Sequence, residues 1–341
     1  MQGLMAPASQ LFSPGPVPNT LRVSCVADRL CVARSEAEMI DALRAGGERA
    51  LVLGQGSNVV LPERLDQPVV LAAWRGLRLR VRGDEALLTC AAGENWHGVV
   101  RYSLGQGWAG LENLALIPGS AGAAPIQNIG AYGVELSERV VEVRVFDRAE
   151  KRVRTLDAEA CGFGYRDSLF KADSARYAVL SLTLRLARRL AMRLDYPDVG
   201  LELQRQGVTK PTPRQVAEAV IRIRRRKLPD PRHWGNAGSF FKNPIIDPGQ
   251  AKRLAQGEPG LVAHPVVGGV KLAAAQLIDR CGWKGRRRGY VGVWHRQPLV
   301  LVNFGTGSGP DFLALGEQVR RSVRERFGVD LELEPSVLSR E

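Results

Sequence analysis

The pattern of apolar and polar positions in the first 60 residues predicts a compact β-α-β unit. Apolar residues at 23–32 and again at 50–53 are typical of strands. Between them, Ser35 is followed three positions later by a glutamate, which is the capping-box signature of a helix start. Apolar residues follow at helical spacing, and the helix is expected to end at Gly46. Residues 1–20 are rich in Pro, Ser and Gly and are expected to form an irregular lead-in.

From residue 74 to about residue 186 the pattern changes to short segments in which apolar and polar residues alternate. Such alternation predicts strands with one exposed face. We expect these strands at 77–82, 86–92, 140–146 and 177–186. A helix is expected at 94–104. Between these elements, residues 117–133 are rich in Gly and Ala, so the backbone there can approach a ligand closely.

The last third of the chain is expected to contain more helices. Residues 190–212 are interpreted as a connecting region. Thr212 and Pro213 then predict the N-cap and first turn of a helix that ends before Pro229. The remaining elements are expected as helices at 272–281 and 311–327 and as strands at 299–304 and 329–334.

Composition is typical of a globular protein. The chain has 341 residues, of which 45% are apolar and 24% charged, so two or three domains are expected. Because no run of about 18 apolar residues occurs, no membrane span is expected, and the first 20 residues do not resemble a secretion signal. Five cysteines without a CxxC pair are interpreted as reduced thiols of a cytoplasmic protein. The four histidines are scattered as well, so no metal site is expected.

The net charge of +13 leaves three interpretations open. Basic residues cluster at 222–227 and 286–288, and the simplest interpretation is a solvated surface. An anionic small-molecule ligand is the second. A nucleic-acid groove is the third, but such grooves interleave aromatic with basic residues. Aromatic residues make up only 6% of the chain and are not interleaved with these clusters.

Two loops carry residue types that suit a phosphorylated cofactor. The strand at 50–53 runs into the loop GQGSN at 54–58, where glycines let backbone N–H groups point at an anion and the Ser and Asn add donors. This loop is neither a P-loop nor a complete dinucleotide fingerprint, and a tight turn without a ligand is the alternative. Residues 110–133 add small side chains and amides that suit a diphosphate and a flat ring. A buried interface of small residues is the alternative there.

Two further glycine-containing segments carry candidate catalytic side chains. Residues 162–168 place an Arg beside glycines and an aromatic residue, which suits binding of a carboxylate or phosphate. A structural Arg–Asp pair is the alternative. Residues 235–244 place a Ser, a Lys and an Asn on one loop, and this Ser lies outside the GxSxG pattern of α/β-hydrolases. A structural loop with a surface Ser is the alternative.

Taken in order, these motifs resemble a single family. Similar motifs occur in the UDP-N-acetylenolpyruvoylglucosamine reductases (MurB). The matching segments are GQGSN from residue 54, LIPGSAGAAPIQNIGAYGVEL from residue 116, FGYRDSLFK from residue 163, KLPDP from residue 227 and GNAGSFFKNP from residue 235. Two further matching segments follow later in the chain: KLAAAQLID, and HRQ before a predicted strand. The resemblance covers about residues 18–334.

The resemblance implies an α+β fold. A two-domain FAD-binding unit of the vanillyl-alcohol-oxidase (PCMH) type is followed by a C-terminal α+β substrate-binding domain. The implied parts are FAD-binding subdomains at 1–75 and 76–188, a connecting insertion at 189–213, the substrate-binding domain at 214–328, and a C-terminal strand and tail at 329–341. The insertion resembles that of the longer subtype, in which a tyrosine closes over the substrate's diphosphate.

The resemblance also implies noncovalent FAD as cofactor and NADPH as co-substrate. The residues implied to bind the cofactor are Gly54, Gln55, Gly56, Ser57, Asn58, Pro118, Gly119, Ser120, Gly122, Ala123, Gln127, Asn128 and Gly130. Those implied to bind the substrate are Tyr196, Lys227, Lys242, Asn243 and Lys284.

Three residues are implied to be catalytic. Arg166 would polarise the enolpyruvyl carboxylate, Ser239 would donate a proton, and Glu334 would help to polarise the substrate. The choice of glutamate depends on the alignment register. Reading the C-terminal segment without a gap gives Glu334, whereas aligning on the following proline gives Ser336. The ungapped register is preferred because it keeps the leucines on one face of the segment and the glutamates on the other.

The implied reaction is reduction of UDP-N-acetylglucosamine enolpyruvate to UDP-N-acetylmuramate in peptidoglycan precursor synthesis. Hydride would come from N5 of reduced FAD and the proton from Ser239. A flavin oxidase is one alternative, but many oxidases attach FAD through a His, and none lies at 54–58 or 117–133. A basic nucleic-acid-binding protein fits the charge alone. The expected partners are small-molecule substrates, without nucleic acid or membrane, and the protein is expected to be a monomer in the cytoplasm.

Overall fold

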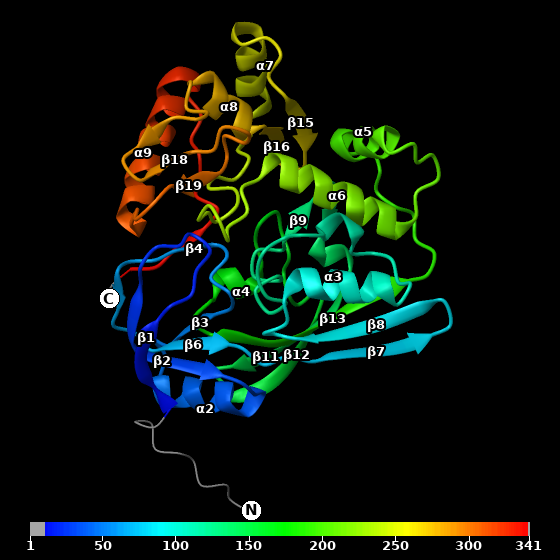
Figure 1. Ribbon diagram of the computed structural model, residues 1–341, viewed down its shortest axis with the longest axis vertical. Coiled ribbons are helices and arrows are strands. Elements are labelled where there is room, and N and C mark those ends of the chain that lie inside the picture. Colours follow the sequence, from blue (N-terminus) through cyan, green and yellow to red (C-terminus); the bar gives the residue numbers. More distant parts are fainter. Residues whose placement is uncertain (1–10, 340–341) are drawn as a thin grey trace, which may run out of the picture.

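The computed structural model describes residues 11–339. The N-terminal part of the chain forms a five-stranded sheet. Its elements, with the short β4 beside them, are β1 (Ser13–Pro16), β2 (Val26–Ala33), α2 (Glu36–Gly46), β3 (Leu51–Leu53), β4 (Val59–Val60), β5 (Arg64–Leu65) and β6 (Val69–Ala72). Strands β2, β6 and β3 are parallel neighbours, and β1 lies antiparallel to β2. Figure 1 shows α2 on one face of this sheet.

The predicted β-α-β unit is confirmed, with one difference at its start. Ser35 Oγ accepts the N–H of Glu38 at 3.1 Å and so caps α2 as predicted. The irregular lead-in expected at 1–20 is wrong for Ser13–Pro16, because their backbone pairs with β2. Residues 1–10 lie outside the described part of the chain.

A second, antiparallel sheet has the order β12-β11-β13-β8-β7. Its strands are β7 (Leu77–Arg82), β8 (Glu85–Ala91), β11 (Val140–Asp147), β12 (Arg152–Asp157) and β13 (Tyr177–Ala187). The four predicted strands are confirmed, and β12 is an additional strand that the sequence analysis missed.

The central strand β13 is mostly buried, so the expectation of one exposed face is wrong for it. Ala178 and Leu180 share a core with Met39 and Leu43 of α2. Further along the strand, Leu182 and its neighbours join the larger core of the second unit. Strand β13 therefore contributes to two cores, and the core that it shares with α2 packs the second sheet against the first unit.

The segment between β8 and β11 contains short elements that surround the glycine-rich stretch. Helix α3 (Trp96–Gly105) confirms the helix expected at 94–104, and Asn95 Oδ1 caps it by accepting the N–H of Gly98 at 2.9 Å. The remaining short elements here and before β13 are the 3₁₀ turns η1 (Glu112–Leu114) and η2 (Leu136–Glu138), the strands β9 (Gly130–Ala131) and β10 (Val134–Glu135), and α4 (Leu169–Ala172).

Two helices connect the sheets to the C-terminal unit. Residues 190–212 are not merely a connection, because they contain helix α5 (Pro197–Arg205). Helix α6 (Pro213–Lys227) begins as predicted, with a capping box between Thr212 and Gln215. The apolar face of α6 is buried in the same core as α3 and α5.

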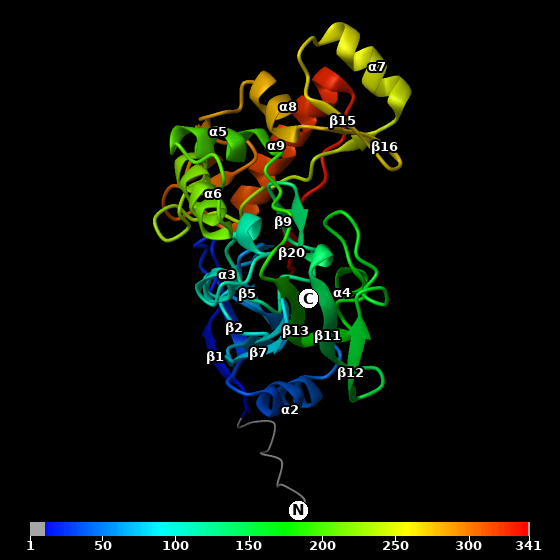
Figure 2. The same cartoon turned by 90° about the vertical axis from the view of Figure 1, so that its right-hand side faces the viewer.

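The C-terminal unit combines helices with two three-stranded sheets. Its elements are β14 (Ile245–Ile246), α7 (Pro248–Gly257), β15 (Ala263–Val266), β16 (Gly269–Leu272), α8 (Ala274–Arg280), β17 (Arg287–Arg288), β18 (Val291–Val293), β19 (Leu301–Asn303) and α9 (Gly309–Phe327). Helices α8 and α9 and strand β19 confirm the elements expected there. Figure 2 shows α7 projecting from the end of this unit farthest from α2.

The last strand differs from the expectation. Residues 329–334 do not form a strand: only Leu333 makes a bridge, to Phe241. The strand is β20 (Ser336–Val337), which pairs in parallel with β4. Apolar and polar residues do alternate in this segment, but it pairs with the chain around Phe241 over too short a length to form a strand. Figure 2 shows β20 among the elements of the N-terminal half, so the chain returns there after α9.

Within residues 11–339, no helix combines the length and the apolar character needed to cross a bilayer. All five cysteines are free, and four of them are buried. Burial raises the pKa of the Cys25 thiol to about 11, so this thiol stays protonated near neutral pH.

Asn303 at the end of β19 fixes the C-terminal unit to the N-terminal segment. Its buried Nδ2 donates to the carbonyls of Leu21 and Gly307 at 3.3 and 3.0 Å, and its Oδ1 accepts the N–H groups of Gly305 and Gly307. One side chain therefore satisfies backbone groups from both units.

We expect Asn303→Ala to lower the free energy of unfolding by about 3 kcal/mol, because each buried polar group left unpaired costs about 1–3 kcal/mol. Urea unfolding followed by circular dichroism measures this change. Gln318→Ala, at an exposed position of α9, is the control and should leave the midpoint unchanged. An unchanged midpoint for Asn303→Ala would contradict the role of this side chain.

Candidate active site

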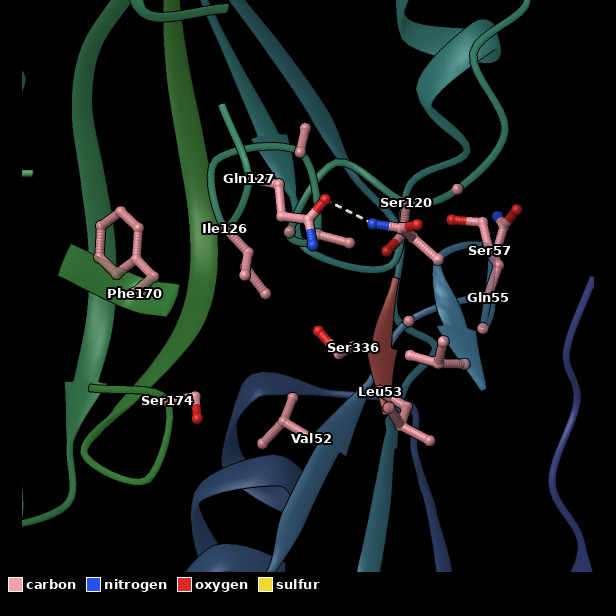
Figure 3. Close-up of a pocket in the computed structure, with 18 of the residues that line it drawn as sticks. Val52, Leu53, Gln55, Ser57, Ser120, Ile126, Gln127, Phe170, Ser174 and Ser336 are labelled. Atoms are coloured by element: carbon pink, nitrogen blue, oxygen red, sulfur yellow. Dashed lines mark hydrogen bonds between the residues drawn. The ribbon is translucent and has the colours of Figure 1, made fainter. Parts of the chain in front are cut away.

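A cavity of about 670 Å³ lies between the two sheets and the C-terminal unit. This volume is in the usual range for small-molecule sites. The lining comes from 48–59, 117–130, 237–239 and 334–339, together with single side chains from other elements. In Figure 3, Gln55 and Ser57 from the first loop, Ser120 and Gln127 from the second, and Ser336 from β20 surround the same space.

The two glycine-containing loops touch each other at the cavity wall. A Cβ on Gly54 would lie 2.1 Å from Ser120 Oγ, and one on Gly119 would lie 2.6 Å from Ser57 Oγ. Gly119 also has a φ of +121°, which side chains rarely allow. Glycine is therefore required at both positions for the loops to approach this closely.

This wall suits a diphosphate. Ser120 Oγ is buried, and it has no hydrogen-bond partner within residues 11–339. Buried hydroxyls are normally paired, so an unpaired one on a cavity wall indicates that a ligand supplies the partner. With Ser57 beside it, the wall offers two hydroxyls to an anionic group. The residues present therefore fit the diphosphate of FAD.

Most of the predicted cofactor residues meet at this cavity. Those that line it are Gly54, Gln55, Gly56, Ser57, Asn58, Pro118, Gly119, Ser120, Gly122, Ala123, Gln127 and Gly130. Asn128 is the exception. Its buried side chain donates to Glu135 and to the carbonyl of Gly164, both at 3.0 Å, and accepts the N–H of Ser137. Its side chain therefore fixes loops of the protein.

Two of the predicted cofactor amides that line the cavity also hold the C-terminal segment. Gln127 Nε2 donates to the backbone carbonyl of Glu334 at 2.8 Å, and Asn58 Nδ2 donates to Gln127 Oε1. The carbonyl of Asn58 also accepts the N–H of Ser336 at 3.0 Å. These bonds place the backbone of Glu334 at the cavity wall.

The three predicted catalytic residues all line the cavity. Arg166 Nε donates to Glu334 Oε1 at 3.0 Å, across 168 residues of sequence. A second nitrogen of Arg166 donates to the carbonyl of Gly130 at 2.9 Å. Arg166 has a φ of +55°, an unusual conformation for a non-glycine residue, and such strain often marks functional sites.

The surroundings of Glu334 shift the pKa of its carboxyl upward. Burial raises the pKa of this carboxyl above its usual range, although Arg166, Lys171 and Lys242 act in the opposite direction. Ser336, the alternative in the sequence alignment, lies on β20 and does not pair with Arg166. Both Glu334 and Ser336 line the cavity, and of the two it is Glu334 that bonds to Arg166.

Ser239 reaches the cavity from a loop of the C-terminal unit. Gly238 precedes it with a φ of +72°, and Asn236 Oδ1 accepts the N–H of Gly238 at 3.0 Å. Ser239 forms a bridge with Val300 next to β19. Within residues 11–339 its hydroxyl makes no hydrogen bond, so it is available to a ligand.

The predicted substrate residues lie outside the cavity lining, and three of them form ion pairs. Lys227 pairs with Asp198 at 2.6 Å, Lys242 with Glu332 at 2.8 Å, and Lys284 with Asp279 at 3.2 Å. The Lys227 pair joins the end of α6 to the first turn of α5. Binding of an anion by these ammonium groups would require them to share or leave their present partners.

Tyr196 and Asn243 occupy structural positions beside the cavity. The Tyr196 ring packs edge-on against the Tyr132 ring, with the centroids 5.3 Å apart, and is partly exposed at the start of α5. Asn243 Oδ1 accepts the N–H of Ala274 at 3.0 Å. Asn243 thus holds the first turn of α8.

The structure adds Arg224, which the sequence analysis did not single out within its basic cluster. Arg224 is half-buried, lines the cavity and interacts with the Tyr132 hydroxyl, and its buried Nε has no partner within the described residues. Burial lowers the pKa of its guanidinium. The signal available in the sequence was a basic residue on the apolar face of α6, next to Val220 and Ile223.

Comparisons with known proteins agree with this site. The C-terminal domain of UDP-N-acetylenolpyruvoylglucosamine reductase matches residues 230–338, and an FAD binding domain matches residues 27–156. The UDP-N-acetylenolpyruvoylglucosamine reductase of Paraburkholderia phymatum is 49% identical and covers 94% of this chain and 95% of its own. The Pseudomonas aeruginosa protein of the same name is 48% identical over 94% and 96%. The chain belongs to the UDP-N-acetylenolpyruvoylglucosamine reductase family.

A solved structure supports the same fold. The MurB crystal structure from Thermus caldophilus has 26% identity and a TM-score of 0.65, over 96% of this chain and 100% of that one. The α+β architecture expected for this reductase is confirmed, with an FAD-binding unit followed by a substrate-binding domain. FAD is its cofactor, in agreement with the matching domain and with the wall formed by Ser57 and Ser120.

We expect Ser120→Ala to weaken FAD binding by about 10- to 100-fold, because hydrogen bonds to charged groups contribute about 1.5–3 kcal/mol. The stability of the apoprotein should be unchanged or slightly higher, since the substitution removes an unpaired buried hydroxyl. Quenching of FAD fluorescence measures the affinity. Ser103→Ala is the control, because Ser103 is buried but bonds to the carbonyl of Val100 within α3. FAD affinity equal to wild type would show that Ser120 faces no cofactor oxygen.

Proposed function

We propose that this reductase converts UDP-N-acetylglucosamine enolpyruvate to UDP-N-acetylmuramate, with NADPH as the reductant. The observation that carries the proposal is that Arg166, Glu334 and Ser239 converge on one cavity whose other walls suit FAD. The reaction adds a hydride and a proton across the enolpyruvyl double bond while NADPH is oxidised. FAD, when bound, supplies the hydride chemistry.

Arg166 binds the substrate carboxylate in this proposal. Negative charge increases on that carboxylate as hydride adds to the far end of the double bond. A guanidinium fixed in advance stabilises such charge without reorganising. Arg166 is suited to this because the carbonyl of Gly130 and the carboxyl of Glu334 both hold it.

Glu334 acts in its protonated form. A raised pKa, caused by burial, lets this carboxyl donate a hydrogen bond to the substrate carboxylate, whereas its anion would repel the substrate. Lys171 donates to the carbonyl of Arg166 at 3.1 Å and stiffens the turn that carries the guanidinium.

Ser239 donates the proton to the carbon next to the carboxylate. Its hydroxyl lies on a loop of the C-terminal unit, whereas the loops that suit FAD belong to the N-terminal part of the chain, and all of them line one cavity. The general-acid role is unusual for a hydroxyl, because its intrinsic pKa is high.

The substrate's diphosphate end is assigned to the border between α5, α6 and the C-terminal unit. Tyr196, Lys227, Lys242, Asn243 and Lys284 are proposed to bind it. The Lys227–Asp198 pair and the Tyr196–Tyr132 contact hold α5 against the rim of the cavity. When substrate enters, its diphosphate competes for the lysine and Tyr196 closes over it.

The proposal includes the organisation of the protein. Five parts of the chain are proposed to act together: FAD-binding subdomains at 1–75 and 76–188, an insertion at 189–213, a substrate-binding domain at 214–328 and a C-terminal segment at 329–341. The protein is proposed to be a monomer that acts on small molecules in the cytoplasm.

Ser239→Ala separates chemistry from binding. We expect NADPH to reduce the bound flavin at nearly the normal rate, because that step needs no proton from Ser239. Reoxidation by the enolpyruvyl substrate should slow by at least ~100-fold. Stopped-flow absorbance of the flavin measures both half-reactions, and Ser239→Cys should recover part of the second. Normal reoxidation in Ser239→Ala would rule out the proton-donor role.

Tyr196→Phe tests the diphosphate site. Removing one hydroxyl should weaken binding of the UDP substrate by about 1–2 kcal/mol, while the NADPH half-reaction changes less. Substrate titration of the flavin spectrum measures this. Tyr290→Phe, at an exposed position on the turn after β17, is the control. Equal loss in both half-reactions would contradict a substrate-specific lid.

A further inference from the structure

The first turn of α3 holds the second cavity loop through a row of hydrogen bonds. The N–H of Trp96 donates to the carbonyl of Gly119 at 2.9 Å, and the N–H of Ala121 donates to the carbonyl of Glu94 at 2.8 Å. These bonds are between backbone atoms and do not depend on pH. The row ends at His97, whose imidazole contributes the only side-chain acceptor in it.

His97 Nδ1 accepts the backbone N–H of Leu116 at 3.0 Å. Leu116 has a φ of +60°, in the left-handed region that leucine rarely adopts. Such a conformation persists only where surrounding contacts impose it. The residues that follow, from Ile117 to Ser120, form the wall of the cavity.

The hydrogen bond fixes the protonation state of His97. Nδ1 can accept only when it carries no proton, so the ring must be neutral with its hydrogen on Nε2. The charged groups that act on the ring are all cations: Arg101 on α3 itself, and Arg224 and Arg225 on α6. Burial and these three guanidinium groups lower the pKa of His97 below its ordinary value. The accepting form therefore predominates at neutral pH.

His97 does not line the cavity, so it cannot exchange a proton with a ligand there. Its hydrogen bond to the loop that forms the wall is the one with the N–H of Leu116. We propose that His97 is a positioning residue of the cofactor site: its neutral ring holds Leu116 in the left-handed conformation that places Ile117–Ser120 against FAD. This inference rests on the proposed function, in which this wall binds FAD.

The sign of the pH effect follows from the bond. Protonation turns Nδ1 from an acceptor into a donor that faces another donor, the N–H of Leu116. The wall then loses its anchor, and FAD affinity should fall as the pH drops below neutrality. Because the pKa is lowered, this loss begins below the ordinary histidine value near 6.5.

Substitutions at position 97 separate the acceptor from the ring. Asparagine places Oδ1 at the same distance from Cβ as Nδ1 and does not titrate, whereas leucine has no acceptor. At pH 7.5 we expect His97→Leu to weaken FAD binding at least ~10-fold and His97→Asn to remain within ~3-fold of wild type. Between pH 7.5 and 5.5 the wild-type affinity should decline toward that of His97→Leu, while the affinity of His97→Asn declines less. Titration of apoprotein with FAD, followed by quenching of flavin fluorescence, gives both results.

His264→Asn is the matched control, because this histidine is exposed on β15. It should keep the wild-type affinity and pH profile. Wild-type affinity of His97→Leu at pH 7.5, or an unchanged pH profile in His97→Asn, would overturn the role of His97. If His97→Leu does not fold, the pH profile of His97→Asn decides alone. Failure of the wild-type protein to bind FAD would instead contradict the proposed function as a whole.

Discussion

The hydrogen bonds that hold the backbone of Glu334 are the constraint on which the rest of the site depends. Gln127 donates to the Glu334 carbonyl, and Asn58 donates to Gln127. These residues come from the two cofactor loops and the C-terminal segment, which are far apart in the sequence. Because amide groups give directional bonds, the three segments have one mutual arrangement. Together with the bond from the Glu334 N–H to the carbonyl of Phe240, at 3.0 Å, they fix the Glu334 backbone beside Arg166.

The Arg166–Glu334 pair is the chemical consequence of that arrangement. Both side chains are largely buried, with exposures of 19% and 17%. Removing two charges from water is costly unless other partners satisfy them. The guanidinium has the carbonyl of Gly130 as a further acceptor, and burial shifts the carboxyl toward its neutral form. The proposed role of the pair, binding of the substrate carboxylate, depends on this partly compensated guanidinium at the cavity wall.

Much of the scaffold follows from local pattern. The caps at Ser35 and Thr212 and the alternating strands of the second sheet appear where the sequence predicts them, because these signals act over a few residues. The burial of β13 could not be read in this way, since Ala178 and Leu180 are covered by a helix from another unit. The same holds for residues 329–334, whose alternation is correct but whose partner segment is too short.

The sequence by itself determined the residue types of the site: the glycine loops, Arg166, Ser239 and a C-terminal glutamate. Their motifs are contiguous, so they can be recognised without knowing where the chain goes. Only the tertiary structure decided which side chains face the cavity. The Asn128 side chain bonds to other parts of the protein, and Asn58 and Gln127 hold Glu334. Arg224, on helix α6, lines the cavity. These outcomes depend on hydrogen bonds between segments up to 276 residues apart, and no local pattern contains that information.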